Sequence, residues 1–246
     1  VQIQFNLSDL QLGFSVSSLT IVAALAMMFS GPLSDKYGRK LVLKYCALIF
    51  TVSAIGSALA TGFTSFLIFR MLGGLGVGAS LIVAPMYIAE IAPASKRGRL
   101  VSFNQLNIVL GITIAFFTNY YILSLADHTS SWVSNYGIAE HNWRWMLGIE
   151  ALPAIVYFFA LFSVPKSPRW LMSKGNENKA TAVLQKFISV EETAEEIKAI
   201  NAALNNVNSS RKTPITELFK PAMRLVLTIG IVVSVLQQIT GINAVF

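Results

Sequence analysis

Four amide side chains stand inside apolar stretches of the sequence, where their hydrogen-bonding groups could bind a small polar solute. They are Gln105, Gln237, Gln238 and Asn243. An amide offers hydrogen-bond donors and an acceptor together, as a hydroxyl group does. In a hydrocarbon environment a polar side chain is costly and tends to face a cavity, although it can instead bond a neighbouring helix. On an ideal helix Gln238 and Asn243 lie about 140° apart, and Gly241 between them permits a break in the helix.

Two charged side chains also lie within apolar stretches. Glu150 stands eight residues into the stretch that opens at Trp143, and Arg70 lies early in another stretch, toward the same end. An ionisable residue within a membrane span is a functional candidate by default. The alternative interpretation is a structural ion pair between Arg70 and Glu150.

A charged turn separates the first two apolar stretches. Its sequence is Gly31-Pro-Leu-Ser-Asp35-Lys-Tyr-Gly38-Arg39-Lys40. Gly38 suits a backbone position with positive φ. A carboxylate and a basic cluster across a tight turn can lock against other helix ends and release when those ends move. The alternative is an ordinary basic loop of a membrane protein.

The composition indicates which solvent these groups meet. Of the 246 residues, 54% are hydrophobic and 13% are charged, whereas a soluble domain has about 25% charged residues. Lipid is therefore the expected solvent for most of the chain. The net charge of +7 does not indicate nucleic acid, because the basic residues fall in short loops between apolar stretches. The single Cys46 excludes a disulfide framework, and we expect no metal and no cofactor.

Six stretches are long enough to cross a hydrocarbon core about 30 Å thick as helices. They cover approximately residues 12–32, 41–61, 65–89, 100–125, 143–164 and 222–246. The expected fold class is therefore an all-α, polytopic membrane protein. Gly74, Gly76 and Gly78 lie within the third stretch with no strand before them. They predict close helix packing rather than a nucleotide-binding loop.

The loops predict the orientation of the chain and one sizeable polar segment. Lys and Arg gather in 33–40, 90–99 and 165–221 and are missing from 1–11, 62–66 and 126–142, which assigns the first group to the cytoplasm. Within the cytoplasmic segment we expect amphipathic helices at 175–188 and 190–206. The second should end in the polar run 201–210, and a short helix should open at Thr213–Pro214.

Four further motifs follow the charged turn along the chain. They are Pro85-Met-Tyr87-Ile-Ala-Glu90-Ile-Ala-Pro93 with Arg97-Gly98-Arg99, then Trp143-Arg144-Trp145, then Pro165-Lys166-Ser167-Pro168-Arg169-Trp170-Leu171, and Gln237-Gln238-Ile-Thr240-Gly241-Ile-Asn243. Together the five motifs resemble the sugar porter family of the major facilitator superfamily, over essentially the whole chain. The resemblance implies a fold of twelve spans in two six-helix halves.

On that resemblance the chain corresponds to spans two to seven and has three parts. An N-terminal bundle (spans two to six) occupies 1–165, an intracellular helical linker 166–220, and the start of the C-terminal bundle (span seven) 221–246. Span one and spans eight to twelve are absent from this alignment. We therefore interpret the start at Val1 and the end at Phe246 as cut ends, and the fold as incomplete.

The resemblance also implies roles for the polar residues. Positions that hydrogen-bond sugar hydroxyls match Gln105, Gln237, Gln238 and Asn243. Positions that flank a proton-accepting Asp of span one, in bacterial D-xylose:proton symporters, match Arg70 and Glu150. Positions of an inner gate, made of ion pairs between the two halves, match Asp35, Arg39, Glu90, Arg97 and Arg169. The chain departs from the family at Lys166, where a Glu is usual, so Lys166 is left out of the gate.

The expected function is secondary active transport of a monosaccharide, a pentose or a hexose, rather than catalysis by an enzyme. Transport would proceed by alternating access. Glu150 favours proton-coupled symport, because passive sugar facilitators generally lack this acid. The alternatives are a proton-independent facilitator and a membrane sugar sensor that does not transport. The expected partners are the sugar, protons, the lipid bilayer and the missing C-terminal half of the same carrier, with no nucleic acid. The expected location is a cell membrane, most simply a bacterial inner membrane.

Overall fold

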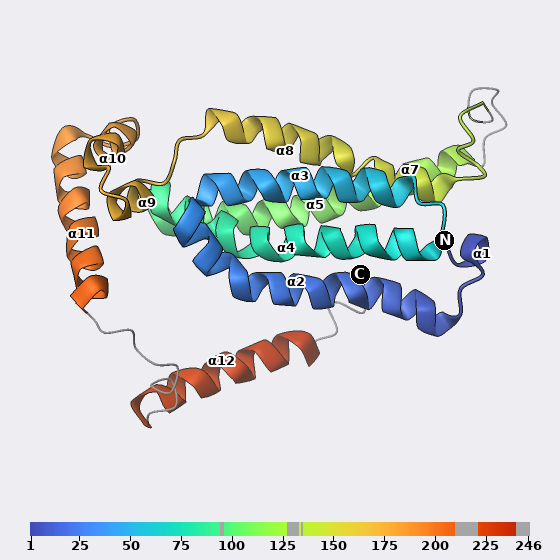
Figure 1. The fold of residues 1–246 in the computed structure, drawn as a ribbon, viewed down its shortest axis with the longest axis horizontal. Helices are drawn as coiled ribbons and strands as arrows, with labels where there is room; N and C mark the ends of the chain where they lie inside the picture. The colour runs from blue at the N-terminus through green and yellow to red at the C-terminus, as the bar shows by residue number, and fades with distance from the viewer. Residues whose placement is uncertain (94–95, 127–132, 134, 210–220, 240–246) are drawn as a thin grey trace. The chain divides into compact units, whose positions relative to one another are not determined.

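The computed structural model describes residues 1–93, 96–126, 133, 135–209 and 221–239, and no β-strand occurs in that part of the chain. The helices (Figure 1) are α1 Gln2–Phe5, α2 Asp9–Tyr37, α3 Arg39–Ala58, α4 Phe63–Ile91, α5 Arg97–Ala126, α7 Asn142–Gly148, α8 Ala151–Ser163, α9 Pro168–Ser173, α10 Glu177–Leu184, α11 Val190–Ser209 and α12 Pro221–Ile239. The predicted all-α class is confirmed.

Five of the six predicted spans are helices long and apolar enough to cross a membrane. They are Asp9–Tyr37, Arg39–Ala58, Phe63–Ile91, Arg97–Ala126 and Asn142–Ser163. For the sixth, α12 holds a shorter apolar stretch, Met223–Leu236. The rest of that predicted span, 240–246, lies outside the described residues.

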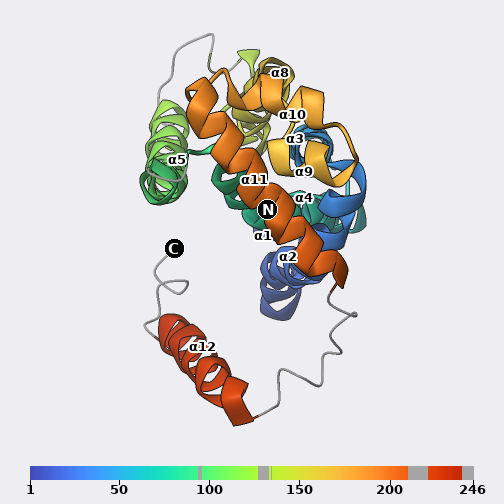
Figure 2. The same ribbon diagram turned by 90° about the vertical axis from the view of Figure 1, so that its left-hand side faces the viewer.

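Chain contacts divide the molecule into two units, Val1–Ile197 and Lys198–Phe246. Within the first unit, α4 packs against α2 on one side and α3 on the other, as Figure 2 shows. Four glycines of α4 make this possible. A Cβ on Gly74 or Gly78 would lie 2.5 or 2.0 Å from a backbone oxygen of α2, and one on Gly73 or Gly76 would meet side chains of α3. The predicted close packing is confirmed, and it follows from the missing side chains.

The other face of α3 packs against α8, and an apolar core lies between α3, α4 and α8. Val42, Leu43, Cys46 and Ala47 of α3 meet Val83 and Tyr87 of α4 and Leu161 of α8. Cys46 is a buried packing residue of this core.

The fifth span is broken where Glu150 stands. Helix α7 ends at Gly148 and α8 begins at Ala151. Pro153 explains the break, because it has no amide hydrogen and its ring clashes with the carbonyl four residues earlier in an unbroken helix. The amide of Leu152 donates to Ile149 O at 3.1 Å instead.

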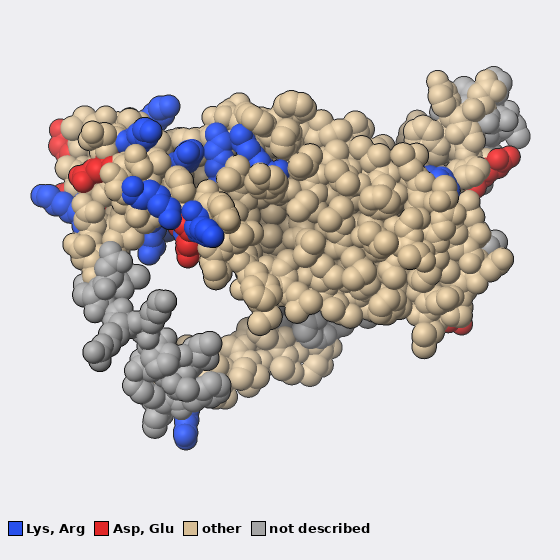
Figure 3. Space-filling view, viewed as in Figure 1, with Lys and Arg blue, Asp and Glu red and all other residues tan. Residues whose placement is uncertain are grey.

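Most charged side chains gather at one end of the bundle, while few lie along its length on the face shown in Figure 3. At this end Arg39 of the α2–α3 turn and Arg97 of the start of α5 each pair with a carboxylate of another helix. Large apolar side chains stay exposed along the spans, for example Phe117 on α5 and Phe159 on α8. An apolar surface of this kind is typical of a lipid-facing bundle.

The polar segment after α8 differs in detail from its prediction. Helix α9 was not expected, and α10 covers only the middle of the predicted 175–188. Helix α11 begins as predicted, since Ser189 and Glu192 form reciprocal side-chain-to-backbone bonds at its N-terminus. It continues to Ser209, through most of the polar run expected to end it, because that run includes the good helix formers Ala202 and Ala203. The turn expected at Thr213–Pro214 lies outside the described residues.

Candidate functional site

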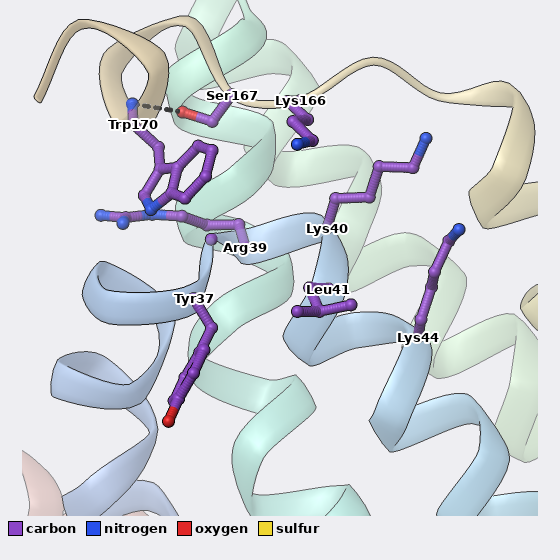
Figure 4. Close-up of a pocket in the computed structure, with 9 residues that line it drawn as sticks. Tyr37, Arg39, Lys40, Leu41, Lys44, Lys166, Ser167 and Trp170 are labelled. Carbon is purple, nitrogen blue, oxygen red and sulfur yellow. Dashed lines mark hydrogen bonds between the residues drawn. The ribbon is translucent and has the colours of Figure 1, made fainter. Parts of the chain in front are cut away.

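The α2–α3 turn is fixed by Gly38 and the indole of Trp170. Gly38 has φ 93° and ψ 143°, a conformation that a side chain strongly disfavours, so the predicted positive φ is confirmed. Trp170 of α9 lies against the glycine, and its Nε1 donates to Asp35 O at 3.1 Å. The turn thereby places Arg39 beneath the indole, at the first position of α3 (Figure 4).

Arg39 is the centre of a buried charge cluster. Its Nη2 lies 2.7 Å from Asp35 Oδ1 and 2.9 Å from Glu90 Oε1, and its Nη1 donates to Ser34 O at 3.2 Å. The side chains of Arg39 and Glu90 are 8% and 7% exposed, whereas that of Asp35 is 68% exposed. One guanidinium therefore joins the ends of α2, α3 and α4, and its buried carboxylate partner is on α4.

Ser167 extends this cluster to α9, and the sequence analysis did not assign it a role. Its hydroxyl donates to Glu90 Oε2 at 2.5 Å and accepts from the amide of Trp170 at 3.1 Å, which caps α9. Nearby, Tyr87 Oη donates to Pro165 O at 2.6 Å. The dipeptide Ser167-Pro168 carried a usable signal, because Ser followed by Pro is typical of a helix start.

Arg97, another residue of the proposed gate, pairs with Glu196 and not with Glu90. Its Nη2 lies 3.2 Å from Glu196 Oε1, and its Nε donates to Ala89 O at 2.8 Å. Arg97 stands at the start of α5 and Glu196 on α11, so this pair joins a span to the polar segment after α8. Spacing along the sequence gave no signal for Glu196, 99 residues away.

Arg169 is exposed, and within the described ranges it forms no ion pair. All the ion pairs of Asp35, Arg39, Glu90 and Arg97 described above join residues of the unit Val1–Ile197. An interlock between two halves therefore stays a prediction.

The amides expected to bind a solute are only partly described. Gln105 is exposed on α5, a helix on which only Ile122 is buried. Gln237 and Gln238 lie on α12, but their side chains are outside what the structure describes, as is the whole of Asn243. Gly241, where a helix break was expected, is outside the described residues as well.

Glu150 and Arg70 lie within electrostatic reach of one another, Glu150 at the α7–α8 break and Arg70 on α4. They do not form a direct ion pair, since no oxygen–nitrogen distance between these two described side chains is 4.0 Å or less. Another arginine of the same region, Arg144, has backbone partners: it donates to Ala58 O and Ala60 O, at the end of α3, at 2.9 and 2.8 Å. The structural ion pair that was the alternative role of Arg70 is therefore not formed here.

Comparison of the sequence with known proteins shows which family the chain belongs to. The sequence model described as Sugar (and other) transporter matches residues 2–246. The chain is 38% identical over 250 residues to the glucose transport protein of Synechocystis sp., covering 100% of this chain and 52% of that protein. It is 36% identical over 252 residues to the D-xylose-proton symporter of Escherichia coli, covering 95% of this chain and 49% of that protein.

The fold agrees with the sequence match. A partially occluded, inward-open structure of the xylose transporter XylE from Escherichia coli superposes with a TM-score of 0.80 at 33% identity, over 96% of this chain and 54% of that one. The chain thus spans about half the length of the curated relatives that it matches. Since the family match covers almost the whole chain, this multi-pass membrane protein belongs to the family of sugar (and other) transporters, with the fold of the major facilitator superfamily.

Proposed function

We propose that this chain is part of a secondary carrier that moves a monosaccharide across a membrane by alternating access. The observation that carries the proposal is the buried Arg39, which joins carboxylates of two helices at the charged end of an otherwise apolar bundle. Breaking a buried ion pair of this kind is costly, so the conformational equilibrium of a carrier is sensitive to whether the cluster is formed. The chemistry is that of a gate for transport, not of an enzyme.

A sugar is the proposed substrate for two reasons. Relatives whose transported substrate is named carry sugars, and the chain has amide side chains that can hydrogen-bond sugar hydroxyl groups. A glucose transport protein and a D-xylose-proton symporter are among those relatives. Gln105 is exposed on α5 and free to accept and donate hydrogen bonds to hydroxyl groups. Gln237, Gln238 and Asn243 complete the proposed set from span seven. A second bundle, in the remainder of the carrier, would close the cavity.

Proton coupling is proposed from the charges within the apolar region. Glu150 stands at a break in its span and within electrostatic reach of Arg70, without a direct pair. A carboxylate that is not locked in an ion pair can change its charge state or bias that of a third group. We therefore propose that Arg70 and Glu150 tune a proton acceptor elsewhere in the carrier.

Counterflow into proteoliposomes tests the transport proposal. The full-length carrier that contains this chain is reconstituted, the vesicles are loaded with unlabelled D-xylose or D-glucose, and labelled sugar is added outside. A carrier accumulates the label transiently above its external concentration, because outward flux of unlabelled sugar returns binding sites to the outside. Binding of the sugar without counterflow would instead identify a sensor and reject transport.

A further inference from the structure

Three lysines converge at the charged end of the bundle without an acidic partner. A pocket of about 220 Å³, here called the basic pocket, is lined by Tyr37, Gly38, Arg39, Lys40, Leu41, Lys44, Lys166, Ser167 and Trp170. No Asp or Glu is among these lining residues. Lys40 and Lys44 extend from α3, and Lys166 extends from the connection between α8 and α9 (Figure 4).

The lysine ammonium groups are held by carbonyls and aromatic rings rather than by carboxylates. Lys40 Nζ donates to Phe162 O at 3.1 Å and to Val164 O at 2.5 Å. Lys44 Nζ lies 3.3 Å from the ring centroid of Phe162, and Lys166 Nζ lies 5.4 Å from that of Trp170. Lys40 also lies within the range of electrostatic repulsion by Lys44 and Lys166. Three like charges this close repel one another, and a bound anion would remove that repulsion.

The backbone at this pocket favours an anion as well. Helix α3 begins here, its N-cap Gly38 provides no side-chain cap, and no acidic residue lies in its first turn. The first amides of a helix have no partner within the helix, and the helix dipole places partial positive charge on them. This end of α3 therefore adds to the field of the lysines.

An apolar groove adjoins the basic pocket and shares two of its residues. This groove, of about 800 Å³, runs between α2, α3 and α4 and is lined by Phe29, Leu33, Tyr45 and Ile49 among others, with Tyr37 and Leu41 common to both cavities. Tyr37, Leu41 and Tyr45 are exposed on the side of the spans. A free phosphate ion would use only the pocket, whereas a lipid would use the pocket for its headgroup and the groove for an acyl chain.

We propose that the basic pocket and the apolar groove together bind an anionic phospholipid of the cytoplasmic leaflet. The phosphate contacts Lys40, Lys44 and Lys166, and an acyl chain lies along α2 and α3 past Tyr37 and Leu41. The end of the bundle that holds the basic loops faces the cytoplasm by the distribution of Lys and Arg. The usual family acid at the position of Lys166 would repel such a headgroup, so the site depends on this chain's own lysine. The site is separate from the proposed sugar-binding residues.

Native mass spectrometry of the full-length carrier in detergent tests this proposal. Phosphatidylglycerol and phosphatidylcholine with identical acyl chains are added in equal amounts, and the bound fraction of each is measured. The wild-type protein should retain phosphatidylglycerol preferentially. Each lysine near an anionic headgroup contributes on the order of fivefold in affinity, so Lys44→Gln with Lys166→Gln should weaken phosphatidylglycerol binding by about 25-fold and leave phosphatidylcholine unchanged.

Two variants separate charge at this site from charge in general. Lys166→Arg keeps the positive charge and should keep the preference. Lys179→Gln removes an exposed lysine of α10 outside the pocket and should have no effect. Equal retention of both lipids by the wild type, or an unchanged preference in the double variant, would overturn the proposal. Displacement of the lipid by an equal concentration of glycerol 3-phosphate would also overturn it, because the acyl chain would then contribute nothing.

Discussion

At the scale of single residues, Arg39 binds two carboxylates that differ in burial, and this difference separates their roles. Glu90 is 7% exposed and also accepts a bond from Ser167, whereas Asp35 is 68% exposed. Removing one partner of a buried pair costs about 3–5 kcal/mol, while an exposed pair contributes about 0–1 kcal/mol. The gate proposed here therefore depends on Glu90.

Glu90→Gln should impair transport while leaving sugar binding largely intact. If the state with the Arg39–Glu90 pair loses even 1.4 kcal/mol, its population falls about tenfold, so counterflow should slow by about that factor. Sugar affinity is measured on the same preparation by equilibrium binding. Asp35→Asn is the matched control and should change the counterflow rate less than twofold. Loss of sugar binding with unchanged turnover in Glu90→Gln would contradict the gate assignment.

Gly38 is needed for both its conformation and its missing side chain. Its φ is +93°, and a Cβ would lie 3.0 Å from the Trp170 indole. Gly38→Ala should therefore lower the free energy of unfolding by about 1–3 kcal/mol, measured as a lower thermal midpoint of the purified protein. Gly175, with φ +74° and no atom within 4 Å of a Cβ, is the control for conformation alone. Equal losses in Gly38→Ala and Gly175→Ala would show that the contact with Trp170 adds nothing.

At the scale of helices, the packing of α4 against α2 depends on the absence of side chains. A Cβ on Gly78 would lie 2.0 Å from Ala23 O, a backbone atom that cannot move independently of its helix. Gly78→Ala should destabilise the bundle by about 1–3 kcal/mol, the usual cost of overpacking. Gly111→Ala, in α5 and with open space around its Cβ, should be close to neutral. Thermal unfolding of both variants in detergent measures the difference, and a neutral Gly78→Ala would refute close contact.

Arg97 makes two contacts, one with α11 and one with α4, that can be measured separately. Arg97 pairs with Glu196, whose side chain is 26% exposed, and also donates to Ala89 O near the end of α4. Glu196→Gln removes only the partly exposed ion pair and should cost at most about 1 kcal/mol of stability. Arg97→Gln also removes the bond to the carbonyl and should cost about 1 kcal/mol more. Equal losses of stability for Glu196→Gln and Arg97→Gln, measured by thermal unfolding, would mean that the bond to Ala89 O contributes nothing to stability.

The five long spans were predictable because each needs a long apolar run to cross lipid, and the thickness of the hydrocarbon core sets that length. The turn at Gly38 was predictable for a local reason, its backbone conformation. The partner of Arg97 was not, since it depends on a single side-chain contact between α5 and α11, made by residues 99 positions apart. The break before α8 coincides with Pro153, but a proline alone does not predict a break, because Pro32 in α2 and Pro85 in α4 interrupt neither helix. Helix geometry around a proline is decided by neighbouring helices.

At the scale of the whole molecule, the candidate site was predictable only in part. Asp35, Arg39 and Glu90 come together as their charges suggested. The lysines of the basic pocket gave no signal in sequence, because Lys166 lies more than a hundred residues beyond Lys40 and meets it only through the packing of α8 on α3. The proposed sugar site needs residues of a second bundle, so no single half can specify it.

The claim of proton-coupled sugar transport is tested most directly by the pH of the medium. D-xylose or D-glucose, whichever gives counterflow, is added to a lightly buffered, energy-depleted suspension of cells that express the full-length carrier. Symport predicts a rise in external pH on sugar addition, because each sugar enters with a proton, and Glu150→Gln should diminish that rise while counterflow persists. Intact sugar flux with no change in external pH in the wild type would contradict symport and identify a facilitator.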